Sequence, residues 1–260
     1  MENQLHSVRL IGPGRAGKSL ATALESVGWP VIAMLSRADS LAGAASGADL
    51  LVIATPDDSL SRVASAVDPV GSTVVVHLSG SLGLEVLSPH QRVASMHPLV
   101  PLPSPGIGAK RLLSGVRFAV AGDPLAAEMV GALGGKVIEV ADADRDAYHA
   151  AACVASNHLV ALLGQVERLA SRAGLHLEDF LELACASLED VQSLGPAGAL
   201  TGPAARGDFE TLYRHREVLS ASGFASADLA AYDACAELAQ YLASGSPGGS
   251  DAAGEEIAWG

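Results

Sequence analysis

The stretch SVRLIGPGRAGKSLATALESVGWPVIAMLS, residues 7–36, decides the fold of the first half of the chain. The apolar runs 7–11 and 31–35 are predicted strands, and 15–27 between them has helical spacing. A strand, a helix and a strand within about 30 residues form a βαβ unit, whose strands are parallel. The pattern continues with five more apolar runs, at 50–54, 73–78, 93–96, 117–121 and 137–140. Because most of these runs are continuous, we expect an α/β domain with a doubly wound sheet that is covered on both faces.

The second half of the chain is predicted to be helical. Residues 142–173 form a long Ala-rich segment with acidic residues at its start, where a helix dipole favours them. Further helices are predicted at 177–193, 208–221 and 226–243, and the Gly- and Pro-rich segment 195–207 is predicted to be a loop. We therefore expect three parts: a Rossmann-type α/β domain (1–140), an all-α domain (141–243) and a disordered tail (244–260).

The composition indicates a folded cytoplasmic protein. Of the 260 residues, 49% are hydrophobic and 17% are charged, which excludes a disordered chain. Residues 141–260 hold 18 acidic and only 6 basic residues, so neither nucleic acid nor a membrane surface is an expected partner. No leader pattern opens the chain, and no apolar run approaches the roughly 18–20 residues that cross a bilayer. The three cysteines lie far apart in no metal or redox spacing, so we expect reduced thiols and no metal site.

A phosphate-binding loop is predicted directly after the first strand. Gly12-Pro13-Gly14-Arg15-Ala16-Gly17 is a G-x-G-x-x-G that leaves a strand and opens a helix. In such a loop Gly12 permits the tight turn, Gly14 lets the backbone approach a pyrophosphate, and Gly17 lets helix and strand pack closely. The alternative is a glycine-rich turn that binds nothing.

The end of the second predicted strand favours NADP(H) over NAD. An NAD site usually has an acidic residue here that binds the ribose 2′-hydroxyl. This chain has Ser36 and Arg37 instead, and a guanidinium suits a 2′-phosphate. Asp39, two residues further on, is the alternative, with Arg37 then merely solvated.

Three further strand ends carry polar residues, and ligands bind at the carboxyl ends of such strands. The segment 55–58 (TPDD) is either a helix start with acidic caps or part of the cofactor site. The segment 79–81 (SGS) follows His77, which is predicted to lie inside its strand. His97 follows the next strand and either carries protons or packs in a turn before a proline. The residues predicted to line the cofactor are Thr55, Pro56, Ser79 and Gly80.

The helical half offers two candidate features. His149, Cys153 and Asn157 recur every four residues on one helix face, so they either border a wet cleft or form a polar patch at an interface. His149 and Asn157 would lie about 12 Å apart along the axis. Arg206 lies in an acidic region, and either binds a substrate carboxylate or balances local charge.

With these residues in view, the chain resembles predicted oxidoreductases that join a Rossmann-like domain to a DUF2520 domain. The matching stretches are GPGRAGKSLA (12–21), HLSGSLGLEVL (77–87), SMHPL (95–99), YHAAACVASNHLVALL (148–163) and ALTGPAARGD (199–208). The group is similar to ketopantoate reductases, pyrroline-5-carboxylate reductases and β-hydroxyacid dehydrogenases. The resemblance implies NADP(H) on the first domain, a small-molecule substrate in a cleft against the helical domain, and homodimers through the helices.

The resemblance also implies hydride transfer between NADPH and a small carbonyl compound, with ketopantoate as the first candidate. The related enzymes use a lysine on the long helix as proton donor, whereas this chain has no lysine after Lys136. We therefore expect Asn157 to bind the carbonyl oxygen, Arg206 to bind a carboxylate, and His149, His97 or a water molecule to supply the proton. The alternatives are an imine reductase of the pyrroline-5-carboxylate type and a sensor that binds NADPH without catalysis.

Overall fold

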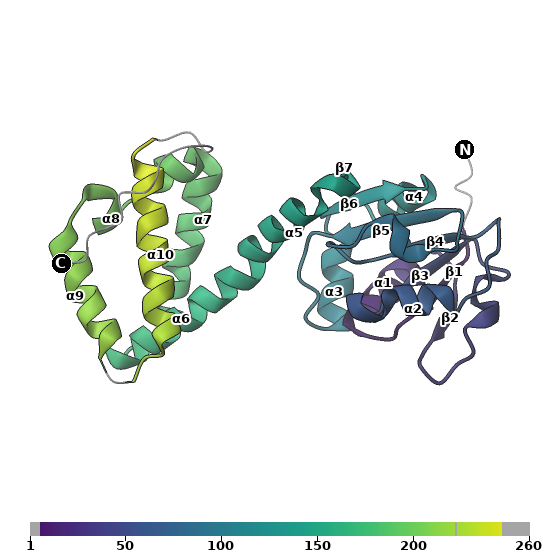
Figure 1. Ribbon diagram of the computed structural model, residues 1–260, viewed down its shortest axis with the longest axis horizontal. Coiled ribbons are helices and arrows are strands. Elements are labelled where there is room, and N and C mark those ends of the chain that lie inside the picture. The colour runs from purple at the N-terminus through teal and green to yellow at the C-terminus, as the bar shows by residue number, and fades with distance from the viewer. Residues whose placement is uncertain (1–5, 222, 246–260) are drawn as a thin grey trace. The chain divides into compact units, whose positions relative to one another are not determined.

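The computed structural model describes residues 6–245 except Ser222. The chain divides into two compact units, residues 1–156 and 157–260 (Figure 1). The boundary predicted near residue 140 coincides with the end of the last strand, and the helix that follows belongs to the first unit. The predicted tail 244–260 lies outside the described residues from residue 246 onward.

The first unit is built on a seven-stranded sheet with the order β2-β1-β3-β4-β5-β6-β7. All seven predicted strands are confirmed. The sheet is parallel except where β5 pairs with β6, which run antiparallel, so the expectation of a parallel sheet is wrong at that pair. The strands are β1 (Val8–Ile11), β2 (Val31–Leu35), β3 (Leu50–Ile53), β4 (Val74–His77), β5 (Val93–Pro98), β6 (Arg117–Gly122) and β7 (Lys136–Glu139).

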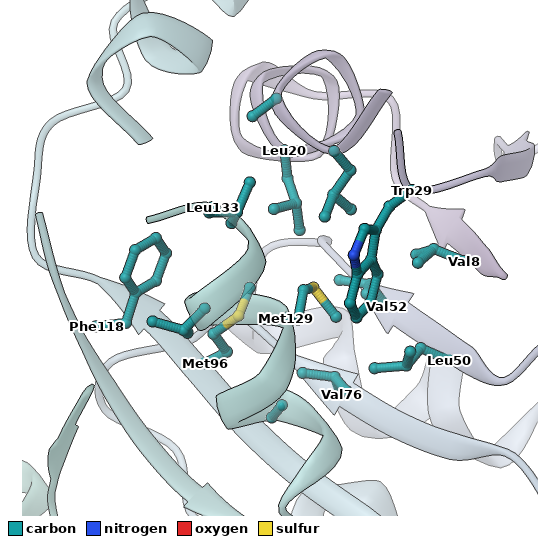
Figure 2. Packing of buried hydrophobic residues seen from close by; sticks show 14 of the residues in the cluster. Val8, Leu20, Trp29, Leu50, Val52, Val76, Met96, Phe118, Met129 and Leu133 are labelled. Carbon is teal, nitrogen blue, oxygen red and sulfur yellow. The ribbon is translucent and has the colours of Figure 1, made fainter. Parts of the chain in front are cut away.

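Alternation along the central strands divides the core between the two faces of the sheet. Leu50 and Val52 of β3 pack on one face, where α1 (Arg15–Ser26), α3 (Pro105–Leu112) and α4 (Leu125–Ala132) cover them (Figure 2). Leu51 and Ile53 of the same strand pack on the other face, against α2 (Asp57–Ser65), η1 (Ala42–Ala45) and η2 (Leu84–Leu87). Because both faces are covered, the strands read as continuous apolar runs.

The segment 142–173, predicted as one long helix, contains more than one kind of helix. It runs through η3 (Asp142–Asp144), α5 (Arg145–Cys153), the π-helical turn η4 (Val154–His158) and α6 (Leu159–Arg172). The π-helical turn contains Val154, Ser156 and Asn157, residue types with weak intrinsic helix propensity, which lowers the cost of widening the helix there.

The second unit continues with four more helices: α7 (Glu178–Ala199), α8 (Pro203–Arg206), α9 (Phe209–Ser220) and α10 (Ser226–Ala243). The helices predicted at 177–193, 208–221 and 226–243 are confirmed. The loop predicted over 195–207 is wrong in part, because α7 resumes after a break at Gly195 and α8 adds a further turn. Pro196 and Pro203 explain both cases, since proline suits the first turn of a helix. None of the helices within the described ranges is long and apolar enough to span a membrane.

Candidate active site

Two glycines of the loop after β1 are required by close packing. Gly12 has φ +105°, and a Cβ there would lie 2.5 Å from the carbonyl oxygen of Ala54, which follows β3. A Cβ on Gly17 would overlap with the carbonyl oxygen of Gly12. The two glycines therefore let β1, β3 and α1 approach each other, as predicted for this kind of loop.

Gly14 is different because open space surrounds it. A Cβ on Gly14 would meet no atom within 4 Å, and its φ of −77° suits any residue. Gly14 is the N-cap of α1, no side chain caps the helix there, and no acidic residue lies in its first turn. The free amide groups and partial positive charge of this helix end can bind an anion.

A cavity of about 730 Å³ lies at this helix end. It collects residues from the glycine loop, from the end of β2, from the end of β3 and from α2. Its lining includes Gly12, Pro13, Gly14, Ser36, Arg37, Thr55, Pro56, Asp58, Ser59 and Arg62. Seven of the predicted cofactor residues thus share one cavity, whereas Arg15, Ala16 and Gly17 continue into α1 and do not line it.

The charges of this cavity favour an anionic ligand group. Arg37 and Arg62 contribute two guanidinium groups, against the single carboxylate of Asp58. Asp39, the alternative partner for a ribose, does not line the cavity. Its Oδ2 accepts hydrogen bonds from the backbone N and Oγ of Ser36 at 2.7 and 2.8 Å, which lowers the pKa of the Asp39 carboxyl. Sequence reasoning missed Arg62, because nothing in a helix-interior arginine marks it as part of a site.

A second group of polar residues lies at the ends of β3 and β4. The segment 55–58 does start a helix, but of its two predicted readings the acidic cap does not apply to Asp57, because the N-cap of α2 is Pro56, without a side-chain cap. Asp57 Oδ2 instead accepts hydrogen bonds from Ser79 Oγ at 2.8 Å and Ser81 Oγ at 2.9 Å. Ser79 Oγ in turn accepts from the backbone N of Ser81 and of Leu82, both at 3.2 Å. The carboxylate thereby fixes the loop after β4.

This loop supports a cluster of aromatic and imidazole rings. His97 at the end of β5 has its Nδ1 2.6 Å from Tyr148 Oη on α5. The His97 ring also stands edge-on to His149, with 6.1 Å between ring centroids. A Cβ on Gly80 would lie 2.9 Å from His149 Cδ2 and 3.0 Å from His97 Nε2, so only glycine leaves room for both rings. The structure thus brings Ser79, Gly80, His97 and His149 together, as expected, and adds Tyr148 to them.

Burial determines the protonation of this cluster. Burial, followed by the charge interaction with His149, lowers the pKa of His97 to about 4. His77, fully buried inside β4, has its pKa lowered to about 4 by burial and then by the positive charge of Arg145. Burial raises the pKa of the Tyr148 phenol. At neutral pH His77, His97 and Tyr148 are therefore uncharged.

Arg145 anchors the first turn of α5 to the sheet. The side chain is buried, with Nε 2.7 Å from Asp142 Oδ1 and Nη2 hydrogen-bonded to Ser95 Oγ of β5. Asp142 also accepts from the backbone N of Leu84 at 3.2 Å. Arg145 and Tyr148 were not predicted as site residues. Their one signal in the sequence is position: they lie three residues apart, on one helix face, just before His149.

The remaining candidates belong to the second unit or to the unit boundary. Asn157 lies in the π-helical turn and is exposed, and Arg206 ends α8 and is exposed. Cys153 Sγ lies 3.8 Å from His149 Nε2 within α5. Roles for Asn157 and Arg206 at the reacting atoms stay predictions. Within the part of the chain that the structure describes, no three His, Cys, Asp or Glu side chains are grouped to bind a metal ion.

The solved structures that resemble this chain share its fold over nearly its full length. A Bacteroides fragilis protein assigned as an NADP oxidoreductase has 18% identity and a TM-score of 0.74, over 92% of this chain and 100% of its own. The reductive aminase of Aspergillus terreus, in complex with NADPH and ethyl-5-oxohexanoate, has 14% identity and a TM-score of 0.70, over 93% and 98%. The Streptomyces aurantiacus imine reductase has 18% identity and a TM-score of 0.62, over 91% and 95%.

The sequence comparisons match part of the chain to a family of unknown function. No curated protein sequence matches the chain. Residues 117–239 match the family described as "Domain of unknown function (DUF2520)". This match confirms the resemblance that the sequence motifs indicate. The matched stretch begins at β6 of the sheet and extends into α10 of the second unit.

Proposed function

We propose that the protein is an NADP(H)-dependent oxidoreductase that reduces a small carbonyl or imine compound. The observation that carries the proposal is the cavity at the N-terminus of α1, with its uncapped amide groups and two guanidinium groups. A glycine-rich turn without a ligand would not need an open helix end beside two arginines. This combination fits a pyrophosphate and a ribose 2′-phosphate.

In this proposal, different residues of the first unit bind different parts of the cofactor. Gly12–Gly14 and the first amide groups of α1 hold the pyrophosphate, and Ser36, Arg37 and Arg62 hold the 2′-phosphate. Thr55 and Pro56 line the path toward the loop Ser79–Gly80, which borders the nicotinamide. NADPH supplies a hydride when bound. The neutral imidazoles and the phenol beside Gly80 supply the polar groups around the reacting atoms.

The substrate is a small carbonyl or imine compound. The A. terreus enzyme was solved with NADPH and a keto ester, and the S. aurantiacus protein is an imine reductase. For a 2-keto acid, with ketopantoate the first to test, Asn157 donates a hydrogen bond to the carbonyl oxygen as negative charge develops there. Arg206 then binds the carboxylate, and the proton comes from the cluster around His97 and His149.

One observation favours an imine as the second candidate substrate. Arg145, the cation beside the ring cluster in the first unit, already binds Asp142 and Ser95. The nearby Asp57 is a carboxylate, and His97 is neutral. These charges suit a neutral or positively charged substrate, such as a protonated imine, better than they suit a carboxylate.

The test is a fluorescence titration with NADPH and NADH, followed by assays of NADPH oxidation with ketopantoate, other 2-keto acids and cyclic imines. We expect NADPH to bind more tightly than NADH. Arg37→Ala and Arg62→Ala should each weaken NADPH binding by about tenfold or more, since a hydrogen bond to a charged group contributes about 1.5–3 kcal/mol. Affinity for NADH should not change. The control Arg117→Ala removes an exposed arginine of β6, outside the cavity, and should change neither affinity.

Each other outcome has a definite meaning. Binding of NADPH without turnover of any compound would support the sensor, a protein of a different class. Tighter binding of NADH would contradict the assignment of Ser36 and Arg37 to a 2′-phosphate. Binding of neither nucleotide would show that the loop Gly12–Gly17 is only a structural turn.

A further inference from the structure

The structure contains a proton-carrying pair that the sequence motifs do not reveal. No lysine follows Lys136, so a group other than lysine must supply the proton to the substrate. Among the described residues, the imidazole and phenol side chains of the cluster beside Gly80 are His77, His97, Tyr148 and His149. His77 is fully buried inside β4. Tyr148 and His97 form a hydrogen bond of 2.6 Å, and both are only partly buried.

We propose that the Tyr148 hydroxyl is the proton donor of the reduction, and that His97 positions it and stabilises its phenolate. The inference rests on the proposed reductase function and deepens it. It assigns the acid to a phenol, a group with an ordinary pKa near 10, rather than to an imidazole. A phenol keeps its proton across the physiological pH range, so the proton donor is protonated in every molecule.

The proposal requires one direction of the hydrogen bond between the two side chains. His97 must carry its proton on Nδ1 and donate it to Tyr148 Oη. The phenolic hydrogen is then free to point at the substrate. If instead Tyr148 donated to Nδ1, its only proton would be occupied in that bond.

The proton transfer balances as follows. As a hydride reaches the substrate carbon, the carbonyl oxygen, or the nitrogen of an imine that enters unprotonated, takes the proton of Tyr148 Oη, and the O–H bond breaks. The phenolate that results keeps the hydrogen bond from His97 Nδ1–H and takes a proton from solvent water. His97 stays neutral and keeps its Nδ1 proton throughout. Both side chains thus return to their starting protonation states with one proton consumed from solvent.

The charged groups around Tyr148 and His97 favour a transient negative charge on Tyr148. Tyr148 is faced by His97 from β5 and by Arg145 on its own helix, and the positive charge of Arg145 stabilises the phenolate. His97 is faced by Tyr148, His149 and Arg145 from α5 and by Asp57 from the start of α2. His149 is less suited to protonate the substrate, because its Nε2 lies 3.8 Å from Cys153 Sγ, one turn further along α5.

The first test measures protonation and does not depend on turnover. Long-range nitrogen–proton NMR on the full chain with labelled histidine reports which ring nitrogen carries the proton. We expect Nδ1–H for His97, and a changed Nδ1 shift in Tyr148→Phe. His77 is an internal control with the opposite tautomer, since the backbone N–H of Ser79 donates to its Nδ1 at 3.2 Å. An Nε2–H tautomer for His97 would overturn the proposal.

The second test compares two tyrosine variants with the same chemical change. Tyr148→Phe should lower kcat/KM about 100-fold or more for whichever compound the assays identify, as expected for loss of a general acid. NADPH affinity should stay within about twofold of that of the wild type. Tyr232→Phe is the matched control, because Tyr232 Oη lies 2.7 Å from His215 Nδ1 in a similar edge-on pair of the second unit. It should leave kcat/KM unchanged.

These results separate the two proposals. A wild-type protein that binds no NADPH, or reduces none of the compounds, contradicts the proposed function, and the role of Tyr148 fails with it. A wild-type reductase whose Tyr148→Phe variant keeps more than half of its kcat/KM contradicts only the role of Tyr148. In that case a loss of activity in His149→Ala would identify His149 as the donor.

Discussion

Two buried imidazoles determine how the first unit responds to acid. His77 is fully buried within β4, and His97 is partly buried, with its ring against Tyr148 of α5. Both have a pKa of about 4 in the folded protein, against 6.5 for an unperturbed histidine, because burial disfavours their charged form. The folded state therefore binds fewer protons than the unfolded state between these two pH values.

We expect the free energy of unfolding to fall as the pH is lowered from 6.5 toward 4. The sign follows from the depressed pKa values: the unfolded chain gains protons in this range and the folded chain does not. The loss is on the order of 3 kcal/mol for each imidazole at the lower limit. Urea unfolding followed by circular dichroism at a series of pH values measures it. His77→Gln, which keeps a hydrogen-bond acceptor but does not titrate, should show a shallower decline, and an equal decline would contradict the prediction.

The carboxylates act in a separate pH range. Asp142 has its pKa lowered below 3.8, first by the hydrogen bond from Arg145. The pKa of Asp49 is lowered by hydrogen bonds from Ser7. Their contribution to stability is lost only when the pH falls through these lower values, so it does not obscure the histidine effect.

At the scale of elements, the strands were predictable and their pairing was not. A strand covered on both faces must be apolar along its whole length, and this marks all seven in the sequence. The same apolar pattern suits parallel and antiparallel pairing, so the reversal between β5 and β6 leaves no trace in it. The turns of helix inside 195–207 and the π-helical turn at Val154–His158 depend on local backbone geometry that composition does not reveal.

The candidate site was likewise predictable from the sequence only in part. Residues that directly follow parallel strands could be grouped from sequence, because the carboxyl ends of such strands lie at one edge. Ser36, Arg37, Thr55 and Pro56 share a cavity for this reason. Arg62, Tyr148 and Arg145 come from helices, and only the packing of α2 and α5 against the sheet brings them to the site. Spacing along the chain carries no information about that packing.

In the glycine loop between β1 and α1, effects on protein stability and on NADPH affinity can be measured separately with two glycine substitutions. Gly12→Ala places a side chain at φ +105° and 2.5 Å from a carbonyl oxygen, so it should destabilise the protein by more than about 2 kcal/mol. Gly14→Ala meets no atom and needs no strained backbone, so its stability should stay within about 0.5 kcal/mol of the wild type. The Gly14→Ala methyl group occupies the space at the helix end, however, and NADPH affinity should fall by about tenfold or more.

Thermal unfolding and NADPH fluorescence titration on the two variants distinguish these effects. A stable Gly14→Ala protein with unchanged NADPH affinity would show that the pyrophosphate does not lie at the N-terminus of α1. A Gly12→Ala protein as stable as the wild type would show that the loop can adopt another conformation. The pair thus tests the geometry of the loop independently of any substrate.

At the scale of the whole molecule, the second unit buries few side chains of its own. Within its described residues, 157–245 without 222, the buried residues are Gln165, Ala170, Leu212, Leu219, Asp228 and Ala236. Two of these are polar, and the Asp228 carboxylate pairs with Arg168. Several large apolar side chains of the same helices are more than half exposed, namely Val160, Leu183, Leu188, Leu194, Phe209, Tyr213 and Leu238. Apolar surface of this extent is typical of a protein interface.

We expect a second copy of the chain to cover this surface, as the resemblance to dimeric reductases implies. Leu183 and Leu194 are eleven residues apart on α7, which places them on one face of the helix. Light scattering coupled to size-exclusion chromatography should give a mass near twice the 26.3 kDa of the chain. Leu183→Glu combined with Leu194→Glu should give the monomer mass, because two charges would be buried without partners in the interface. Ile107→Glu, at an exposed apolar residue of α3 in the first unit, should leave the dimer intact. A wild-type monomer at micromolar concentration would mean that these side chains stay in contact with water, and the homodimer would then be excluded.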